Sequence, residues 1–237
     1  MNQTKDFYES GFGDRLIDPT FFPDEIRQFL RDEKTIMGSI KSLLDLLVEI
    51  GCMHGRYLRW AIEQRKRYLG LDIVPRYVEA GRKTVIELGL SPQHYRFVLG
   101  GAEEIEKLVK PKQLLVKPQR CLLLFPFNSF GNILNPSPVV TGLRESGLPF
   151  LISSYSTTAE ATACREQYYR NCGYHELHLF EDERGVHFVS PDGLHSIAFH
   201  LKYLQKLCMI NGITVEAVPF SKIGMAYTTM TISRCIA

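Results

Sequence analysis

Residues 43–55 read LLDLLVEIGCMHG, an apolar run that stops at a glycine-containing turn. The run Leu43–Glu49 has the length and composition of a strand buried at the centre of a sheet. Gly51 and Gly55 allow the backbone to turn sharply and to approach a ligand closely, because glycine has no Cβ. A helix is expected to follow over residues 55–65. The stretch therefore predicts a strand, a tight turn and a helix.

The same alternation of strand and helix continues through the first two thirds of the chain. Further strands are expected at residues 67–72, 95–99, 120–127 and 148–155, and helices at residues 23–33, 75–88, 102–109 and 139–145. Alternation of this kind predicts a parallel sheet with helices on both of its faces.

After residue 155 the pattern changes. Residues 157–171 are expected to form a helix. Residues 174–200 alternate like short strands, with breaks at Glu183-Arg184-Gly185 and at Asp192-Gly193. Asp-Gly between two alternating runs is a strong signal for a β-hairpin. This segment is expected to form an inserted β-hairpin lid over the carboxyl edge of the sheet.

The C-terminal segment predicts how the sheet closes. A helix at residues 201–210 precedes two strands at 214–220 and 226–233, which a short turn at Gly224 joins. Such a turn is too short for a parallel crossover, so the two strands should pair antiparallel. The expected fold is an α/β fold, a three-layer α/β/α sandwich whose seven-stranded sheet is mostly parallel with an antiparallel last strand.

The chain of 237 residues predicts a single domain, because no repeat, low-complexity tract or linker interrupts the pattern. We expect residues 1–237 to form one unit, with an N-terminal helical arm at residues 1–40 and an inserted substrate lid at residues 157–200.

Composition excludes several classes of partner. The net charge is +2, which leaves no basic footprint for nucleic acid or for an anionic membrane surface. The longest apolar runs, at residues 43–50 and 121–127, are far shorter than the ~20 residues that span a membrane. The six cysteines are scattered without a Cys-x-x-Cys pair, and no basic segment followed by an apolar stretch opens the chain. We therefore expect reduced thiols and a cytoplasmic protein.

Ligands of open α/β sheets bind at the carboxyl ends of the strands. Glu49 and the two glycines follow the first predicted strand, and Asp72 ends the second. Gly100-Gly101-Ala102-Glu103 follows the third strand, and Phe125–Asn128 follows the fourth. Taken singly, Asp72 also fits a helix cap and Glu103 a helix N-terminal acid. Their shared position at successive strand ends predicts one ligand site.

At these residues the sequence resembles the class I (Rossmann-like) S-adenosylmethionine-dependent methyltransferases of the small-molecule type. The first motif of that family is an acid followed by x-Gly-x-Gly-x-Gly, and it is matched by Glu49, Gly51 and Gly55, with Met53 in place of the middle glycine. The ribose-binding acid of the family matches Asp72.

Two further segments carry the resemblance. The adenine-side pair of the family matches Ala102 and Glu103, and the segment that faces the methyl group matches Phe125–Asn128. The resemblance implies S-adenosylmethionine as cofactor and S-adenosylhomocysteine as product. The cofactor contacts that it implies are Glu49, Gly51, Cys52, Met53, Gly55, Asp72, Ile73, Ala102, Glu103, Phe125, Pro126 and Phe127.

On the acceptor side, Asn128 is the best candidate for a functional polar group, although it also fits a cap of the next turn through its own backbone. Asn132, Tyr8 and Tyr155 are the other expected substrate contacts. No residue pattern identifies a catalytic base. We expect no metal, because the strand-like segment around His175-x-x-His178 points the two rings to opposite faces.

The sequence thus predicts methyl transfer to an oxygen, nitrogen or carbon atom of a small metabolite or natural product. One alternative is a non-catalytic S-adenosylmethionine-binding protein of the same fold, since the Met53 side chain narrows the loop. A less favoured alternative is a nicotinamide-dependent enzyme, whose fingerprint requires glycines at 51, 53 and 56, where Met53 and Arg56 stand. The acceptor and the oligomeric state are left open.

Overall fold

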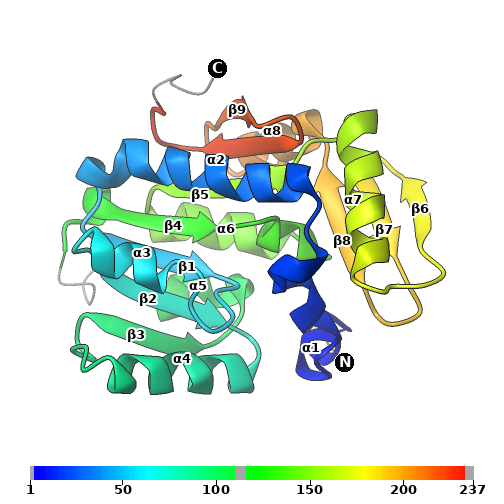
Figure 1. Cartoon of the computed structure of the whole chain (residues 1–237). Helices are drawn as coiled ribbons and strands as arrows, with labels where there is room; N and C mark the ends of the chain where they lie inside the picture. The colour runs from blue at the N-terminus through cyan, green and yellow to red at the C-terminus, as the bar shows by residue number, and fades with distance from the viewer. Residues whose placement is uncertain (1–2, 110–115, 233–237) are drawn as a thin grey trace.

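The computed structural model describes residues 3–109 and 116–232. Within these residues, seven strands form one sheet in the order β3-β2-β1-β4-β5-β10-β9 (Figure 1). Neighbouring strands pair parallel, except that β10 runs antiparallel to β5 and β9. The predicted mostly parallel sheet with an antiparallel last strand is confirmed. The strands are β1 (Leu46–Ile50), β2 (Arg67–Asp72), β3 (Tyr95–Leu99), β4 (Cys121–Phe125), β5 (Phe150–Tyr155), β9 (Glu216–Phe220) and β10 (Gly224–Thr228).

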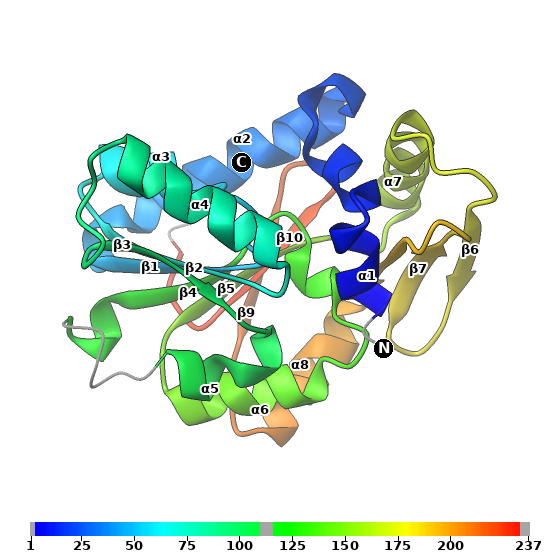
Figure 2. The same ribbon diagram turned by 90° about the horizontal axis from the view of Figure 1, so that it is seen from below.

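Helices cover both faces of the sheet, as the view from below shows (Figure 2). One face carries α2, α3 and α4, and the other carries α5, α6 and α8. The predicted three-layer sandwich is therefore confirmed. The bounds of the helices are α2 (Asp24–Ile40), α3 (Leu58–Glu63), α4 (Pro75–Glu87), α5 (Ile105–Leu108), α6 (Ser137–Ser146) and α8 (Leu201–Ile210), with the short 3-10 helices η3 (Lys41–Leu43), η4 (Ala102–Glu104), η6 (Pro118–Arg120) and η7 (Ser129–Asn132).

The apolar run that predicted the first strand contributes side chains to two hydrophobic cores, one on each face of the sheet. Leu47 packs into the cluster on the α2 side of the sheet, while Leu46 and Val48 pack into the cluster on the α6 side. β4 divides in the same way, with Leu122 and Leu123 on opposite sides. Strands covered on both faces need apolar residues at every position, which explains the continuous run.

The insertion after β5 consists of α7 (Ala159–Asn171) and a separate antiparallel sheet. This sheet has the order β6-β7-β8, with β6 (His178–Glu181), β7 (Gly185–Val189) and β8 (His195–Phe199). The expected hairpin turn at Asp192-Gly193 lies between β7 and β8, and β6 adds a third strand to that hairpin. Figure 1 shows the insertion beyond the carboxyl ends of β4 and β5.

Residues 3–40 of the N-terminal arm are mostly helical. They form α1 (Gln3–Glu9), η1 (Phe12–Ile17) and η2 (Pro19–Phe21) ahead of α2, which extends well past the expected end at residue 33. Several hydrogen bonds attach this arm to the insertion. Among them, the Tyr174 hydroxyl donates to the Phe12 carbonyl at 2.6 Å, and the Tyr168 hydroxyl donates to the Leu16 carbonyl.

Several predicted boundaries shift for local reasons. The fourth strand ends at Phe125 because Phe127 and Asn128 adopt left-handed conformations, with φ of 45° and 58°. The closing turn falls at residues 221–223, since Ser221 has a φ of 52° while Gly224 already pairs within β10. The helix after the first loop begins at Leu58. The last residue of the strand predicted at 226–233 lies outside the described residues.

Substitution of Gly131 tests how closely the insertion docks on the sheet. A Cβ at Gly131, in η7, would collide with the Asn128 side chain and with the Ile197 carbonyl of β8. We expect Gly131→Ala to lower the free energy of unfolding by about 1–3 kcal/mol, because β8 must move. Urea unfolding followed by circular dichroism measures the change.

The matched control is Gly38→Ala in α2, where a Cβ meets nothing within 4 Å. That substitution should raise stability by about 0.5–1 kcal/mol, because alanine favours a helix interior. Equal stability of Gly131→Ala and the unmodified protein would contradict the close packing of β8 against η7.

Candidate functional site

A cavity of about 640 Å³ opens at the carboxyl edge of the sheet. Its walls come from the loops after β1, β2, β3 and β4, from the N-terminal arm and from the insertion. This volume lies within the ~300–1,000 Å³ of small-molecule sites. The sequence-predicted residues that line it are Gly51, Cys52, Met53, Asp72, Ile73, Ala102, Glu103, Phe125, Pro126, Phe127, Tyr8, Asn128, Asn132 and Tyr155.

Asp72 joins the first two loops of the cavity. Its Oδ2 accepts a hydrogen bond from the Met53 amide at 2.7 Å, and its Oδ1 accepts one from the Val74 amide at 2.9 Å. The second bond lies ahead of α4, at its N-cap residue Val74, and no side chain caps this helix, so the alternative helix-cap interpretation of Asp72 is not realised. Burial raises the pKa of Asp72. Each carboxylate oxygen keeps a lone pair with which it can accept a further hydrogen bond.

The loop after β1 accommodates a side chain where the family motif has a glycine. Met53 has a φ of 50°, a conformation that costs a non-glycine residue energy. The hydrogen bond from its amide to Asp72 holds the residue in that conformation. Gly51, with a φ of 72°, remains exposed at the cavity wall. The loop therefore keeps its tight turn despite the substitution.

Glu49 and Gly55 do not line the cavity, contrary to the cofactor contacts expected from the sequence. Glu49 is fully buried behind the loop, where it accepts hydrogen bonds from the Tyr57 amide at 3.0 Å and from the Tyr68 hydroxyl. A Cβ on Gly55, whose φ is 99°, would press on the ring of Phe97. Glu49 and Gly55 therefore support the loop by contacts on the side that faces away from the cavity.

The electrostatic state of Glu49 follows from its burial. Desolvation raises its pKa to about 8, against the effect of the hydrogen bonds from Tyr68 and Tyr57. Its Oε1 atom has no hydrogen-bond partner among the described residues. A neutral carboxyl is favoured in such surroundings, because the ionised form is costly to bury.

The Asn128 side chain links three parts of the fold by hydrogen bonds. Its Nδ2 donates to the Ser196 hydroxyl at 3.1 Å and to the Ile197 carbonyl at 3.2 Å. Its Oδ1 accepts from the Ser154 hydroxyl at 2.7 Å and from the Tyr155 amide at 3.5 Å.

These bonds use all the donors and lone pairs of the Asn128 amide, so they correct the expectation that the amide orients an acceptor. The side chain does not cap η7 either, although the residue stands at the N-cap position. The residue lines the cavity as a structural anchor between β5, η7 and β8.

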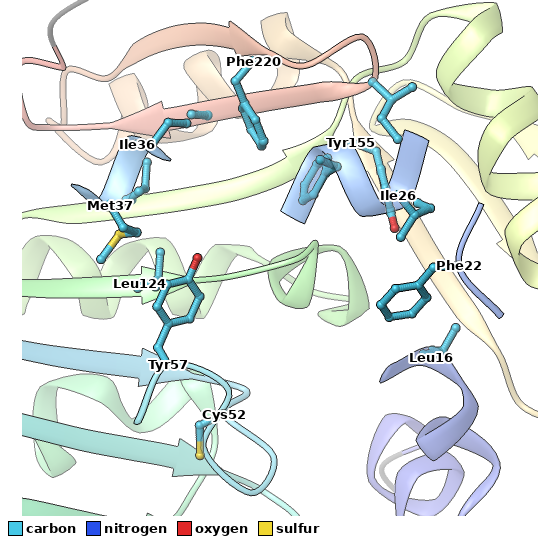
Figure 3. Close-up of a cluster of buried hydrophobic side chains, with 14 of the residues drawn as sticks. Leu16, Phe22, Ile26, Ile36, Met37, Cys52, Tyr57, Leu124, Tyr155 and Phe220 are labelled. Carbon is cyan, nitrogen blue, oxygen red and sulfur yellow. The ribbon is translucent and has the colours of Figure 1, made fainter. Parts of the chain in front are cut away.

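Aromatic side chains surround the end of the cavity nearest the insertion. Phe127, Tyr155, Tyr168 and Tyr169 all line it, and the ring of Phe127 contacts those of Tyr155 and Tyr168 at centroid distances of 6.2 and 6.1 Å. Figure 3 shows the Tyr155 hydroxyl directed toward the side on which Ile26 and Phe22 lie. We call these four rings the aromatic end of the cavity.

The N-terminal arm fixes two of the predicted substrate contacts. The Asn132 side-chain amide donates to the Tyr8 hydroxyl at 2.9 Å, and the Thr4 hydroxyl donates to the Asn132 carbonyl at 3.0 Å. Arg76 donates to the Tyr8 carbonyl at 2.6 Å and forms an ion pair with Asp14 at 2.8 Å. Tyr8 is thereby held at the cavity wall next to the loop after β4.

Sequence reasoning missed other residues of the cavity. Arg56 directly follows the glycine loop, and it could have been noticed in the sequence because it is the charged residue of an otherwise uncharged turn. Nothing in the sequence pointed to Leu16 and Ile17 of the arm or to Ser196 of the insertion, because long-range packing brings them to the site.

Within residues 3–109 and 116–232, no helix is long and apolar enough to cross a membrane, and no group of three or more His, Cys, Asp or Glu residues could hold a metal ion.

The fold is similar to solved structures of methyltransferases. A SAM-dependent methyltransferase from Aquifex aeolicus is 15% identical with a TM-score of 0.55, over 93% of this chain and 96% of that chain. The glycopeptide N-methyltransferase MtfA, solved with S-adenosyl-L-methionine, is 14% identical with a TM-score of 0.55, over 86% of this chain and 94% of that chain.

A third similar structure contains two ligands. It is the 1,6-didemethyltoxoflavin-N1-methyltransferase of Burkholderia thailandensis, solved with 1,6-didemethyltoxoflavin and S-adenosylhomocysteine. It is 13% identical with a TM-score of 0.51, over 86% of this chain and 76% of that chain. No family model and no curated protein sequence matches this chain. At this level of identity the likeness shows the fold: the chain has the Rossmann-like fold of S-adenosylmethionine-dependent methyltransferases.

The buried carboxyl of Glu49 makes stability depend on pH. Its pKa of about 8 in the folded protein exceeds the ordinary value of 4.5, so between these values the folded state holds a proton that the unfolded chain has lost. The contribution of Glu49 to stability is therefore full below about pH 4.5 and is lost as the pH rises to about 8. As the pH rises through this window, the free energy of unfolding of the unmodified protein should fall, relative to that of Glu49→Gln, by up to about 1.4 kcal/mol per pH unit.

Urea unfolding at a series of pH values measures this difference. Glu63→Gln, at an exposed position on α3, serves as the control and should follow the unmodified protein. Parallel pH profiles of the unmodified protein and of Glu49→Gln would show that Glu49 is ionised in the folded state, against the expectation.

Proposed function

We propose that this protein transfers the methyl group of S-adenosylmethionine to an oxygen, nitrogen or carbon atom of a small molecule. One observation carries the proposal: the loops after β1, β2, β3 and β4, which bear the residues matched to the family motifs, meet in a single cavity. The hydrogen bond from the Met53 amide to Asp72 joins the first two of these loops.

The chemistry of the cavity fits this cofactor. Asp72 has lone pairs free to accept hydrogen bonds from a ribose diol, and Ile73 and Ala102 offer apolar surface for an adenine ring. Glu103 stands beside Ala102 at the same wall. Bound there, the cofactor supplies a methyl group on a positively charged sulfur. Aromatic faces attract such a cation, and Tyr8 is available for that contact.

The residues of the aromatic end would hold the acceptor in line with the methyl group. In-line displacement with a good leaving group depends mainly on proximity and orientation, so the rigidity of the walls matters most. The hydrogen bonds of Asn128 to Ser196 and Ile197 fix the insertion relative to the loop after β4. A general base is required only when the acceptor must lose a proton.

The enclosure of the cavity supports a small acceptor. The arm and the insertion are joined through the Tyr168 and Tyr174 hydroxyls, and together they cover the carboxyl edge of the sheet. We propose that residues 157–200 act as a substrate lid within one domain of residues 1–237, because such a cover excludes water from the reaction. A nearly balanced charge gives no support for a nucleic-acid acceptor.

We also propose a cytoplasmic location. The five cysteines within the described residues are free and buried, at positions 52, 121, 164, 172 and 208, and Cys235 lies outside those residues. Buried free thiols are typical of a reducing compartment.

Calorimetric titration with S-adenosylmethionine and S-adenosylhomocysteine tests the proposal. We expect both to bind, and Asp72→Ala to weaken the binding about tenfold to a hundredfold, because charge-assisted hydrogen bonds to the ribose are lost. Asp72→Asn keeps one acceptor oxygen, so its affinity for both compounds should lie between that of the unmodified protein and that of Asp72→Ala. Asp45→Ala is the control, since Asp45 pairs with Arg120 ahead of β1 at the opposite edge of the sheet.

Two results would change the assignment. If neither compound binds a folded protein, the methyltransferase function is wrong, and binding of NAD(P) in their place would support the nicotinamide alternative. If both bind, mass spectrometry of reactions with a broad acceptor panel detects methyl transfer. Transfer to any acceptor eliminates the non-catalytic alternative.

A further inference from the structure

The charges of the cavity are divided between its two ends. Asp72 and Glu103 stand at the end formed by the loops after β2 and β3. At the aromatic end the lining charge is the guanidinium of Arg56, whose Cζ lies 4.5 Å from the centroid of the Phe127 ring. Among the described residues, no carboxylate lies within ion-pair distance of Arg56, whereas Arg76 at the arm is paired with Asp14.

Tyr155 adds an unused donor next to this charge. Tyr155 lines the cavity, and its hydroxyl has no hydrogen-bond partner within the described part of the chain, while the hydroxyls of Tyr168 and Tyr169 donate to the Leu16 carbonyl and the Ser196 hydroxyl. Burial raises the pKa of Tyr155, so the hydroxyl keeps its proton. Arg56 and Tyr155 flank the same ring, that of Phe127.

A second guanidinium reinforces the positive field from behind the cavity wall. Arg165 is fully buried, and it donates to the Val186 and Ser196 carbonyls at 3.1 and 3.0 Å. Its Cζ lies 5.3 Å from the centroid of the Tyr155 ring. No carboxylate in the described chain pairs with it. Burying an uncompensated charge is costly, so an anion bound nearby would be favoured.

The buried acid Glu33 forms no ion pair with Arg56 among the described residues. It does not line the cavity, and its two oxygens accept hydrogen bonds from the Tyr57 hydroxyl at 2.8 Å and from the Phe127 amide at 2.7 Å. Glu33 therefore leaves the donors of Arg56 and Tyr155 available for a ligand.

We propose that the acceptor is a small aromatic anion whose charged oxygen is bound by Arg56 and Tyr155 while its ring packs against Phe127, Tyr168 and Tyr169. The inference rests on the proposed function, which assigns the opposite end of the cavity to the cofactor. A guanidinium binds a carboxylate through directed hydrogen bonds, and the rings select a flat molecule. The same guanidinium chemistry would serve the carboxylate of the cofactor itself, and the experiment separates these two sources.

The probes are 2-naphthoate and its neutral analogue 2-naphthamide, titrated by calorimetry into protein saturated with S-adenosylhomocysteine. We expect the naphthoate to bind about tenfold or more tightly than the naphthamide, because a charge-assisted hydrogen bond is lost with the neutral probe. Arg56→Met should bring the ratio close to one, and Tyr155→Phe should reduce it severalfold. Arg59→Met, at an exposed position on α3, should leave it unchanged.

Equal binding of the two probes, or a preference that survives Arg56→Met, would overturn the proposal. A second titration compares S-adenosylhomocysteine with 5′-methylthioadenosine, which lacks the methionyl carboxylate. If Arg56→Met weakens the first and spares the second, Arg56 binds the cofactor and the acceptor assignment is wrong. If S-adenosylhomocysteine does not bind at all, the proposed function fails, while the naphthoate comparison on the free protein still decides whether the anion site exists.

Discussion

The hydrogen bond from the Met53 amide to the Asp72 carboxylate is the contact on which the candidate site depends. It ties the loop after β1 to the end of β2, and it holds Met53 at a φ of 50°, where a glycine would rest without strain. The loop after β1 therefore makes its tight turn with a methionine at this position. Glu49 supports the same loop from beneath through the Tyr57 amide.

A second set of polar contacts, those of Asn128, positions the insertion at the other end of the cavity. The Asn128 side chain connects the end of β4 to β5 and to β8 through four hydrogen bonds, and it does so from a left-handed backbone conformation. Strained residues of this kind persist only where their surroundings hold them in place. The insertion is thus positioned over the aromatic end by a buried amide, with Arg165 donating to the same β8 strand at the Ser196 carbonyl.

The sequence was most informative where local rules act. Apolar runs that end in glycine located the strands of the parallel sheet, and the strand ends predicted which loops meet, because parallel strands share one carboxyl edge. It was least informative about the partners of polar side chains. Asn128 contacts residues up to 69 positions away, and the burial of Glu49 behind its loop depends on Tyr68 in the neighbouring strand. Arg56 was visible in the sequence, but its place above Phe127 follows only from the fold.

Hydrogen exchange with and without S-adenosylhomocysteine tests most directly whether the four loops form one cofactor site. We expect the ligand to slow exchange of the amides at residues 51–56, 72–74, 100–104 and 127–129 together, since all four segments contribute to the same cavity. Protection confined to one of these loops, or found only on other parts of the chain, would contradict the assignment of this cavity to the cofactor.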